Sequence, residues 1–324
     1  MEPKKQHYVP QFLLSKFAVG KKKRIHTFDL KMAKSFASQI RDVGHENNFY
    51  NHPEEGNQME FQLGKLETKV APIIDKIISE GSIKSLSKGD QKYLGIFTIV
   101  QMMRVNSIRE SLVEMGELIV DKFVGDSVEP DSQADHLLTS FKELDVKTQS
   151  IDMLKETPLQ LLPYILDKHI SLVKAPKGEV FYISDNPIVK YNHQPREHRG
   201  NLGLRVKGVE VHLPISPKFC LSFLCSELVD DIRKAVNHHQ AAVLMESTSP
   251  NGLAESISIL NHIDNKITKE LSSENMEYHN SLQVLHCSRF IYSSNSDFDL
   301  VNIMLSDNPN IGLNPRVVDG SNVF

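Results

Sequence analysis

The sequence has no tryptophan and only three cysteines, at positions 220, 225 and 287. So small and odd a number excludes a disulfide framework and favours a reducing, cytoplasmic compartment. No run of about 18 apolar residues occurs, so no transmembrane helix is expected. The opening MEPKKQHYVP lacks the apolar core of a secretory signal. We therefore expect a cytoplasmic protein that has no membrane partner.

Several motifs that would fix a reaction are also missing. The sequence contains no H-E-x-x-H, no C-x-x-C, no Walker A string, no G-x-G-x-x-G and no G-x-S-x-G. These absences disfavour the corresponding zinc sites, P-loop nucleotide hydrolysis, Rossmann cofactor binding and a serine nucleophile at a strand-to-helix elbow. Any chemistry must therefore come from side chains that are distant in the sequence and meet in the fold.

What is present is an ordinary globular composition with an uneven charge. The 324 residues are 40% hydrophobic and 24% charged, which excludes a disordered or fibrous chain. The net charge is −4, yet residues 1–50 hold ten Lys or Arg against four Asp or Glu, a net of +6. Lys22, Lys23 and Arg24 are the densest part of this excess. They are candidate contacts for a polyanion, and a solvated basic loop is the alternative.

The hydrophobic pattern predicts an α+β fold. Short strands are expected within residues 1–50, and long helices from about residue 59 to residue 173. Pro72 predicts a kink or break in the first long helix, and Ser87 with Asp90 predicts a capping box. Residues 161–173 are expected to be helical, and residues 178–224 to form one mixed or antiparallel sheet. The fold is thus a long-helix core packed on that sheet.

We divide the chain into regions of one domain. Residues 1–175 are the basic opening segment plus the helical region. Residues 176–292 are the region of sheet and helix, and residues 293–324 are a polar tail expected to be partly disordered.

The opening segment carries the most distinctive string, HYVPQFLLSKFA from position 7. His7 titrates near neutral pH and suits acid–base work. Tyr8 can stack or donate a hydrogen bond, and Gln11 is a further polar contact. Pro10 restricts the backbone beside them. Taken alone, one histidine near a terminus is weak evidence of a site.

This string resembles the signature of the bacterial HYVP-motif family, whose function is unknown. Three later strings fit the same resemblance, which extends from residue 6 to about residue 245: ENNFY at 46–50, SDNP at 184–187 and LPISP at 213–217. The resemblance implies a shared fold and a shared pocket. It implies no established activity, and a nuclease role in bacterial conflict is a hypothesis drawn from it.

Two expected helix faces place polar residues in apolar stripes. Glu67 shares a face with Leu63, Val70 and Ile74, while Gln101 and Arg104 interrupt the face of a later helix. A buried arginine needs an anionic partner, and Glu67 is the candidate. The pair is either a salt bridge that fixes helix register or part of a cavity in which Arg104 holds a phosphate.

Asp185 and Asn186 lie where a strand is expected to end. Asp185 could act as a general base or a metal ligand there. The alternative is a local turn, because Ser, Asp, Asn and Pro are common turn residues. Mg²⁺ or Mn²⁺ held by Asp185 and a glutamate is left open as a cofactor.

Two functions remain, beside a purely structural role in a larger complex, in which the pair of Glu67 and Arg104 is architectural. The first is a phosphodiesterase or nuclease acting on RNA or DNA, with RNA favoured because its 2′-hydroxyl permits histidine chemistry without a metal. His7, Glu67, Arg104 and Asp185 are its candidate catalytic residues. The candidate substrate contacts are Tyr8, Gln11, Gln101, Asn186, Lys22, Lys23 and Arg24. The second is a sensor that binds a ligand or partner at the same polar pocket without chemistry. Oligomeric state is not predicted.

Overall fold

The computed structural model describes residues 4–124, 132–142, 145–194, 202–244, 253–313 and 317. Its helices are α1 (Gln11–Phe17), α2 (Gln58–Glu80), α3 (Lys88–Met103), α4 (Asn106–Val124), α5 (Gln133–Lys142), α6 (Val146–Leu166), α7 (Ser226–Leu244), α8 (Ala254–Asp264), α9 (Ser273–His286) and α10 (Asp299–Asp307), with a 3₁₀ turn at Ile40–Asp42. Its strands are β1 (Lys5–His7), β2 (Arg24–Asp29), β3 (Lys34–Gln39), β4 (His45–Asn47), β5 (His169–Lys174), β6 (Ile183–Ser184), β7 (Val189–Asn192), β8 (Val209–Ser216), β9 (Phe219–Leu224), β10 (Lys269–Glu270) and β11 (Phe290–Ser293).

The strands of the described residues form three sheets. A five-stranded sheet has the order β10-β5-β9-β8-β7, a four-stranded sheet has the order β3-β2-β11-β6, and β1 pairs with β4. Only the β10–β5 pair is parallel among these described pairs. The α+β prediction with mixed or antiparallel sheets is therefore confirmed.

The expectation of one sheet from residues 178–224 is wrong in detail. Within that range β6 leaves the five-stranded sheet and pairs with β11, where Tyr292 lies opposite Ile183. In its place β5 and β10, from outside the range, complete the five strands. Sequence pattern indicates that a segment is extended, but it does not say which edge the segment joins.

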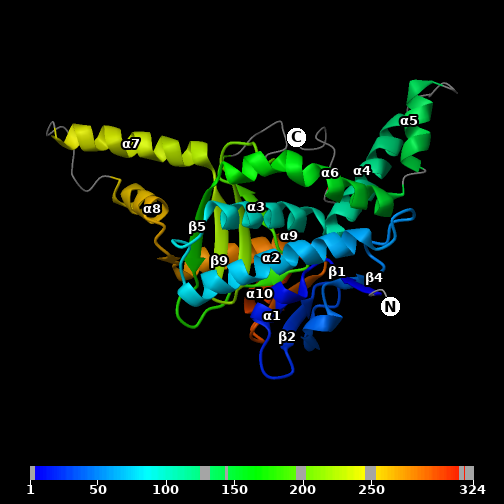
Figure 1. The fold of residues 1–324 in the computed structure, drawn as a ribbon, viewed down its shortest axis with the longest axis horizontal. Coiled ribbons are helices and arrows are strands. Elements are labelled where there is room, and N and C mark those ends of the chain that lie inside the picture. The colour runs from blue at the N-terminus through cyan, green and yellow to red at the C-terminus, as the bar shows by residue number, and fades with distance from the viewer. Residues whose placement is uncertain are drawn as a thin grey trace.

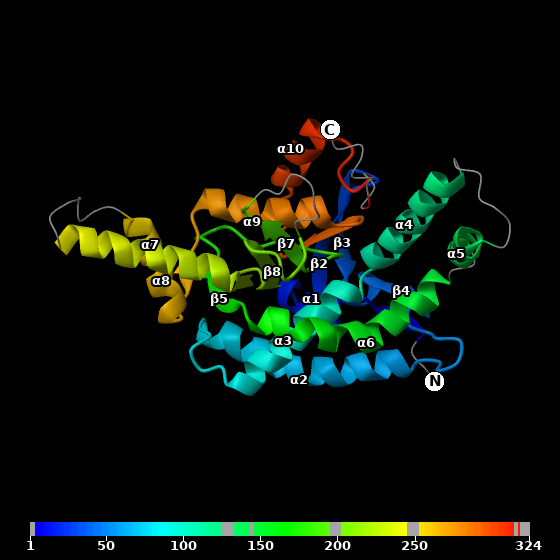
Figure 2. The ribbon, with the colours of Figure 1, turned by 90° about the horizontal axis from the view of Figure 1, so that it is seen from above.

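Helices cover both faces of the five-stranded sheet. Figure 2 shows α2, α3 and α6 together on one side of it and α9 with α10 on the other. One large buried cluster runs from the opening segment through α2, α3 and α6 to β8 and β9. Figure 1 shows α7 and α8 extending from one end of this body and α4 and α5 from the other.

Two helix predictions concern Ser87 and Pro72. The capping box is confirmed, because Ser87 and Asp90 exchange hydrogen bonds at the start of α3. Of the kink or break expected at Pro72, the break does not occur: α2 continues from residue 58 to residue 80. Val70, Ile73, Ile74 and Ile77 are buried on both sides of Pro72, and this packing holds the helix despite the missing N–H.

The predicted helix over 161–173 is also wrong beyond Leu166. Helix α6 ends there, and β5 begins at His169 between β9 and β10. A short apolar run fits a buried strand as well as a helix, so periodicity alone does not separate them.

The expected polar tail contains ordered structure. Val301 of α10 and the preceding Phe298 are buried in a cluster with Phe28 and Ile291. Residues 314–316 and 318–324 lie outside the described part. No helix among the described residues is long and apolar enough to cross a bilayer.

Candidate functional site

The opening strand places two histidines side by side. Strands β1 and β4 are antiparallel, and His7 lies directly opposite His45. Their ring centroids are 5.2 Å apart, with planes inclined by 59°. Residues directly opposite each other in such a pair project to the same face. Because this pairing depends on strand register, sequence reasoning missed His45, which directly precedes the ENNFY string.

Gln6 anchors the strand from its other face. Its side chain is fully buried. Nε2 donates to Asn57 Oδ1 at 2.7 Å, and Oε1 accepts from the backbone N–H of Tyr50 at 2.5 Å. Because successive side chains in a strand alternate between faces, burying Gln6 directs His7 toward His45.

The two imidazoles have little hydrogen bonding within the described residues. The buried atoms Nε2 of His7 and Nδ1 of His45 make no hydrogen bond with the residues described. Gln11 Nε2 lies 3.4 Å from His7 Nδ1. Burial, followed by the charges of His45, Arg104 and Lys5, lowers the pKa of His7 to about 4, while the Arg41 backbone acts in the opposite direction. Burial and Lys5 also lower the pKa of His45. Both rings are therefore mainly neutral at pH 7, and each offers one N–H and one lone pair.

Exposed cations border the pair. Lys5 Nζ is 2.7 Å from Asp42 Oδ1, and Arg41 Nε is 3.6 Å from Asp42 Oδ2. The backbone N–H of Ile40 donates to the carbonyl of Lys23 at 3.3 Å. The basic turn that includes Lys22, Lys23 and Arg24 therefore packs against the 3₁₀ turn whose Arg41 adjoins His7.

Arg104 holds the backbone of the opening segment. Its Nε donates to the carbonyl of Tyr8 at 3.1 Å, and Nη2 donates to the carbonyl of His7 at 3.1 Å. Nη1 lies 2.8 Å from Glu67 Oε1, which confirms Glu67 as the partner expected from the helix faces. Gln101 Nε2 also donates to Tyr8, at 2.8 Å. All three guanidinium nitrogens thus face protein acceptors, and the arrangement positions His7 rather than presenting a phosphate site.

The Asp185 carboxylate also contacts the backbone of another segment. Its Oδ1 accepts from the N–H of Ser288 at 2.8 Å, and its Oδ2 accepts from those of Arg289 and Phe290 at 2.8 and 2.9 Å. Burial raises the pKa of Asp185 to about 6, although these three donors favour the carboxylate. These contacts tie Asp185 to the entry of β11. The local turn of the SDNP string is held by Ser184, whose Oγ accepts from the N–H of Asn186 at 3.2 Å.

Tyr8 lies between Arg104 and Asp185. It is buried, and its ring packs 5.4 Å from that of Phe49. Burial and the nearby charge of Asp185 raise its pKa. Asn186 instead donates to the carbonyl of His286, the last residue of α9, at 3.0 Å.

The structure therefore brings most predicted residues together around residues 6–8. His7, Tyr8 and Gln11 belong to that segment, and Gln101, Arg104 and Glu67 hold it from α3 and α2. Asp185 adjoins Tyr8. The basic turn adjoins the same segment through Arg41, and Asn186 serves a separate turn. Among the residues described, no group of three or more His, Cys, Asp or Glu side chains is arranged to hold a metal ion.

The chain belongs to the family described as Protein of unknown function (DUF4238), whose model matches residues 5–297. No curated protein and no solved structure matches it.

Proposed function

We propose that this member of the DUF4238 family cleaves RNA at phosphodiester bonds, with His7 and His45 exchanging the protons. The observation that carries the proposal is the imidazole pair itself, with 5.2 Å between ring centroids. The charge of Lys5 acts on both rings, and Lys5 and the nearby Arg41 are paired with Asp42. Two imidazoles held together can serve as base and acid in one step. The cations supply attraction for a phosphate backbone.

The proposed step needs no external reactant. One imidazole accepts the proton of a ribose 2′-hydroxyl while that oxygen forms a bond to the adjacent phosphorus. The bond from phosphorus to the 5′-oxygen of the next nucleotide breaks, and the other imidazole, protonated, donates its proton to that oxygen. The products are a 2′,3′-cyclic phosphate and a free 5′-hydroxyl. DNA lacks the attacking hydroxyl, so RNA is the proposed substrate.

Arg104, Gln101 and Glu67 take a positioning role in this proposal. Arg104 and Gln101 donate to the carbonyls of residues 7 and 8, and Glu67 acts through its ion pair with Arg104, so together they set where the imidazole lies. Asp185 supports the same segment from the side of Tyr8. A role in bacterial conflict is part of the proposal and rests on the resemblance of the opening string.

The test uses one labelled RNA and a DNA of the same sequence, each incubated in EDTA, Mg²⁺ or Mn²⁺. Wild type is compared with His7→Asn and His45→Asn, and with His238→Asn as a matched control, because His238 is an exposed histidine on α7. We expect RNA cleavage in EDTA that both site variants lose and the control keeps. Cleavage unchanged in both folded site variants would overturn the proposal.

A sensor without catalysis is the second candidate. It is favoured by the internal engagement of Arg104 and Asp185, because Arg104 donates to two carbonyls and is ion-paired with Glu67, while Asp185 accepts three backbone N–H groups. The same incubation separates the two functions, because a sensor binds RNA and leaves it intact.

A further inference from the structure

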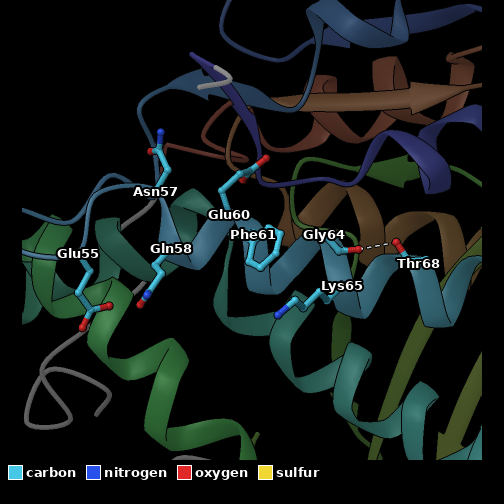
Figure 3. Close-up of a pocket in the computed structure, with 8 residues that line it drawn as sticks. All are labelled: Glu55, Asn57, Gln58, Glu60, Phe61, Gly64, Lys65 and Thr68. Carbon is cyan, nitrogen blue, oxygen red and sulfur yellow. Dashed lines mark hydrogen bonds between the residues drawn. The ribbon is translucent and has the colours of Figure 1, made fainter. Parts of the chain in front are cut away.

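A concave site lies along the first half of α2, next to the opening strand. The cavity has a volume of about 720 Å³, within the range of ligand pockets. Figure 3 shows the residues that line it, which come from α2 and the loop before it: Glu55, Asn57, Gln58, Glu60, Phe61, Gly64, Lys65 and Thr68.

An exposed aromatic ring forms one wall. Phe61 is 62% exposed, although a phenylalanine on a two-sided helix would normally face the core. Lys65 Nζ lies 4.3 Å from the centre of the ring. Figure 3 shows the ring between Gln58 and Gly64, with Lys65 on the next turn. A flat apolar face beside an amide and an ammonium is suited to a planar ligand that carries an anionic group.

Gly64 keeps the space beside the ring open. Glycine inside a helix costs about 1 kcal/mol relative to alanine. A Cβ at this position would meet no atom within 4 Å, so no neighbouring element requires the glycine. A side chain here would project into the cavity and narrow it.

The cavity is less negatively charged than its two glutamates suggest. Glu55 is paired with Lys155 at 2.8 Å. Glu60 lies in the field of the buried Arg104 guanidinium, and Figure 3 shows it projecting to the opposite side of α2 from Lys65. The wall formed by Phe61 therefore carries Lys65 as its charged group, which favours an anion there.

The cavity adjoins the segment that carries His7. Asn57, at its rim, accepts the 2.7 Å hydrogen bond from the buried side chain of Gln6, the residue before His7.

We infer that this cavity binds an unpaired nucleobase of single-stranded RNA: the base stacks on Phe61, Gln58 contacts its edge, and Lys65 contacts its phosphate. Stacking on aromatic side chains is how single strands are held without strong sequence preference, at about 1–3 kcal/mol per base. The inference rests on the proposed RNA substrate, but binding here does not require cleavage.

The test measures binding of a fluorescein-labelled 2′-O-methyl uridine octamer, whose blocked 2′-oxygens prevent cleavage. We expect Phe61→Ala to weaken affinity by about 5- to 150-fold and Phe61→Trp to retain it. Gly64→Leu is expected to weaken it by filling the cavity. Tyr93→Ala is the control, because Tyr93 is an exposed aromatic residue on α3 that does not line the cavity.

Equal affinity of folded Phe61→Ala and wild type would overturn the inference. Uridine monophosphate is expected to compete only weakly, and competition as tight as that of the octamer would overturn the assignment to a strand. His7→Asn should bind the octamer like wild type. If His7→Asn loses cleavage but still binds the octamer, binding and cleavage depend on different residues. A failure of the stacking site is then distinguishable from a failure of the proposed function.

Discussion

The imidazole of His7 lies across the β1–β4 pair from that of His45, with 5.2 Å between ring centroids. Neither residue lies near the other in sequence. The pair exists because Gln6 is buried behind the strand and Arg104 holds the carbonyls of residues 7 and 8.

The pair predicts activity that is greatest in mild acid. One ring must be neutral and the other protonated, and the pKa of His7 is lowered to about 4 while that of His45 is lowered from its usual 6.5. The pair therefore holds one proton mainly between those limits. We expect a bell-shaped pH profile of kcat/KM for RNA cleavage with its maximum between about pH 4 and 6.5. A rate that keeps rising above pH 7 would contradict this account.

Arg104 should be far more important to stability than a surface arginine. Replacing it by methionine leaves Glu67 and the carbonyl of His7 without their donor and the carbonyl of Tyr8 with Gln101 alone, and removing one partner of a buried pair costs about 3–5 kcal/mol. The control is Arg233→Met, whose pair with Asp264 is partly exposed and should contribute about 1 kcal/mol or less. Urea unfolding measures the free energy of unfolding of both variants. Equal losses would show that Arg104 does not stabilise the opening segment more than a surface ion pair would.

Asp185→Asn tests whether Asp185 has a structural role or a catalytic one. An amide offers one oxygen where the carboxylate accepts three N–H bonds, so we expect a loss of about 2–3 kcal/mol in the free energy of unfolding at pH 7. The rate of RNA cleavage per folded molecule should change little. A large fall in kcat with unchanged stability would instead make Asp185 a catalytic group.

Low pH should destabilise the sheet beneath α9. The rings of His212 and His279 are 4.7 Å apart, and burial lowers both pKa values, that of His279 to about 4. Unfolded histidines titrate near 6.5, so the unfolded chain binds more protons between about pH 4 and 6.5, and stability falls as pH falls through that window.

His279→Phe removes one of these imidazoles and should reduce the loss of stability at low pH. Between pH 7.5 and pH 4.5, wild type is expected to lose about 2–3 kcal/mol more than the variant, measured by urea unfolding. Asp185 acts in the opposite direction, since its raised pKa makes the folded state the better proton acceptor, but it is present in both proteins. Parallel pH curves for the two proteins would refute the assignment.

Gly64→Ala should stabilise the protein. The added methyl meets no atom within 4 Å, and alanine is favoured over glycine inside a helix by about 0.5–1 kcal/mol. A rise in Tm is the expected result. A fall in Tm would mean that the glycine serves local packing and not an open cavity.

Much of this fold could be predicted from the sequence, for identifiable reasons. The capping box at Ser87 and the partnership of Glu67 with Arg104 follow from local spacing and the cost of a buried charge. The β5 strand and the unbroken α2 could not be predicted, because in each case tertiary burial outweighs the local signal of a proline or an apolar run.

Only part of the candidate site could likewise be predicted from the sequence. Its opening string was conspicuous, and the resemblance to HYVP-motif proteins stays a prediction. His45 could not be found without the register of β1 and β4, and the roles of Arg104 and Asp185 depended on backbone groups of residues 7, 8 and 288–290, which no side-chain pattern reveals.

The most direct measurement is product analysis on a DNA oligonucleotide that contains one ribonucleotide, incubated with the protein in EDTA. A single cut on the 3′ side of the ribonucleotide is expected. Mass spectrometry should find a 2′,3′-cyclic phosphate and a 5′-hydroxyl, and His7→Asn and His45→Asn should form neither. Cleavage of the all-DNA oligonucleotide, or products that carry a 5′-phosphate, would contradict the role of the imidazole pair.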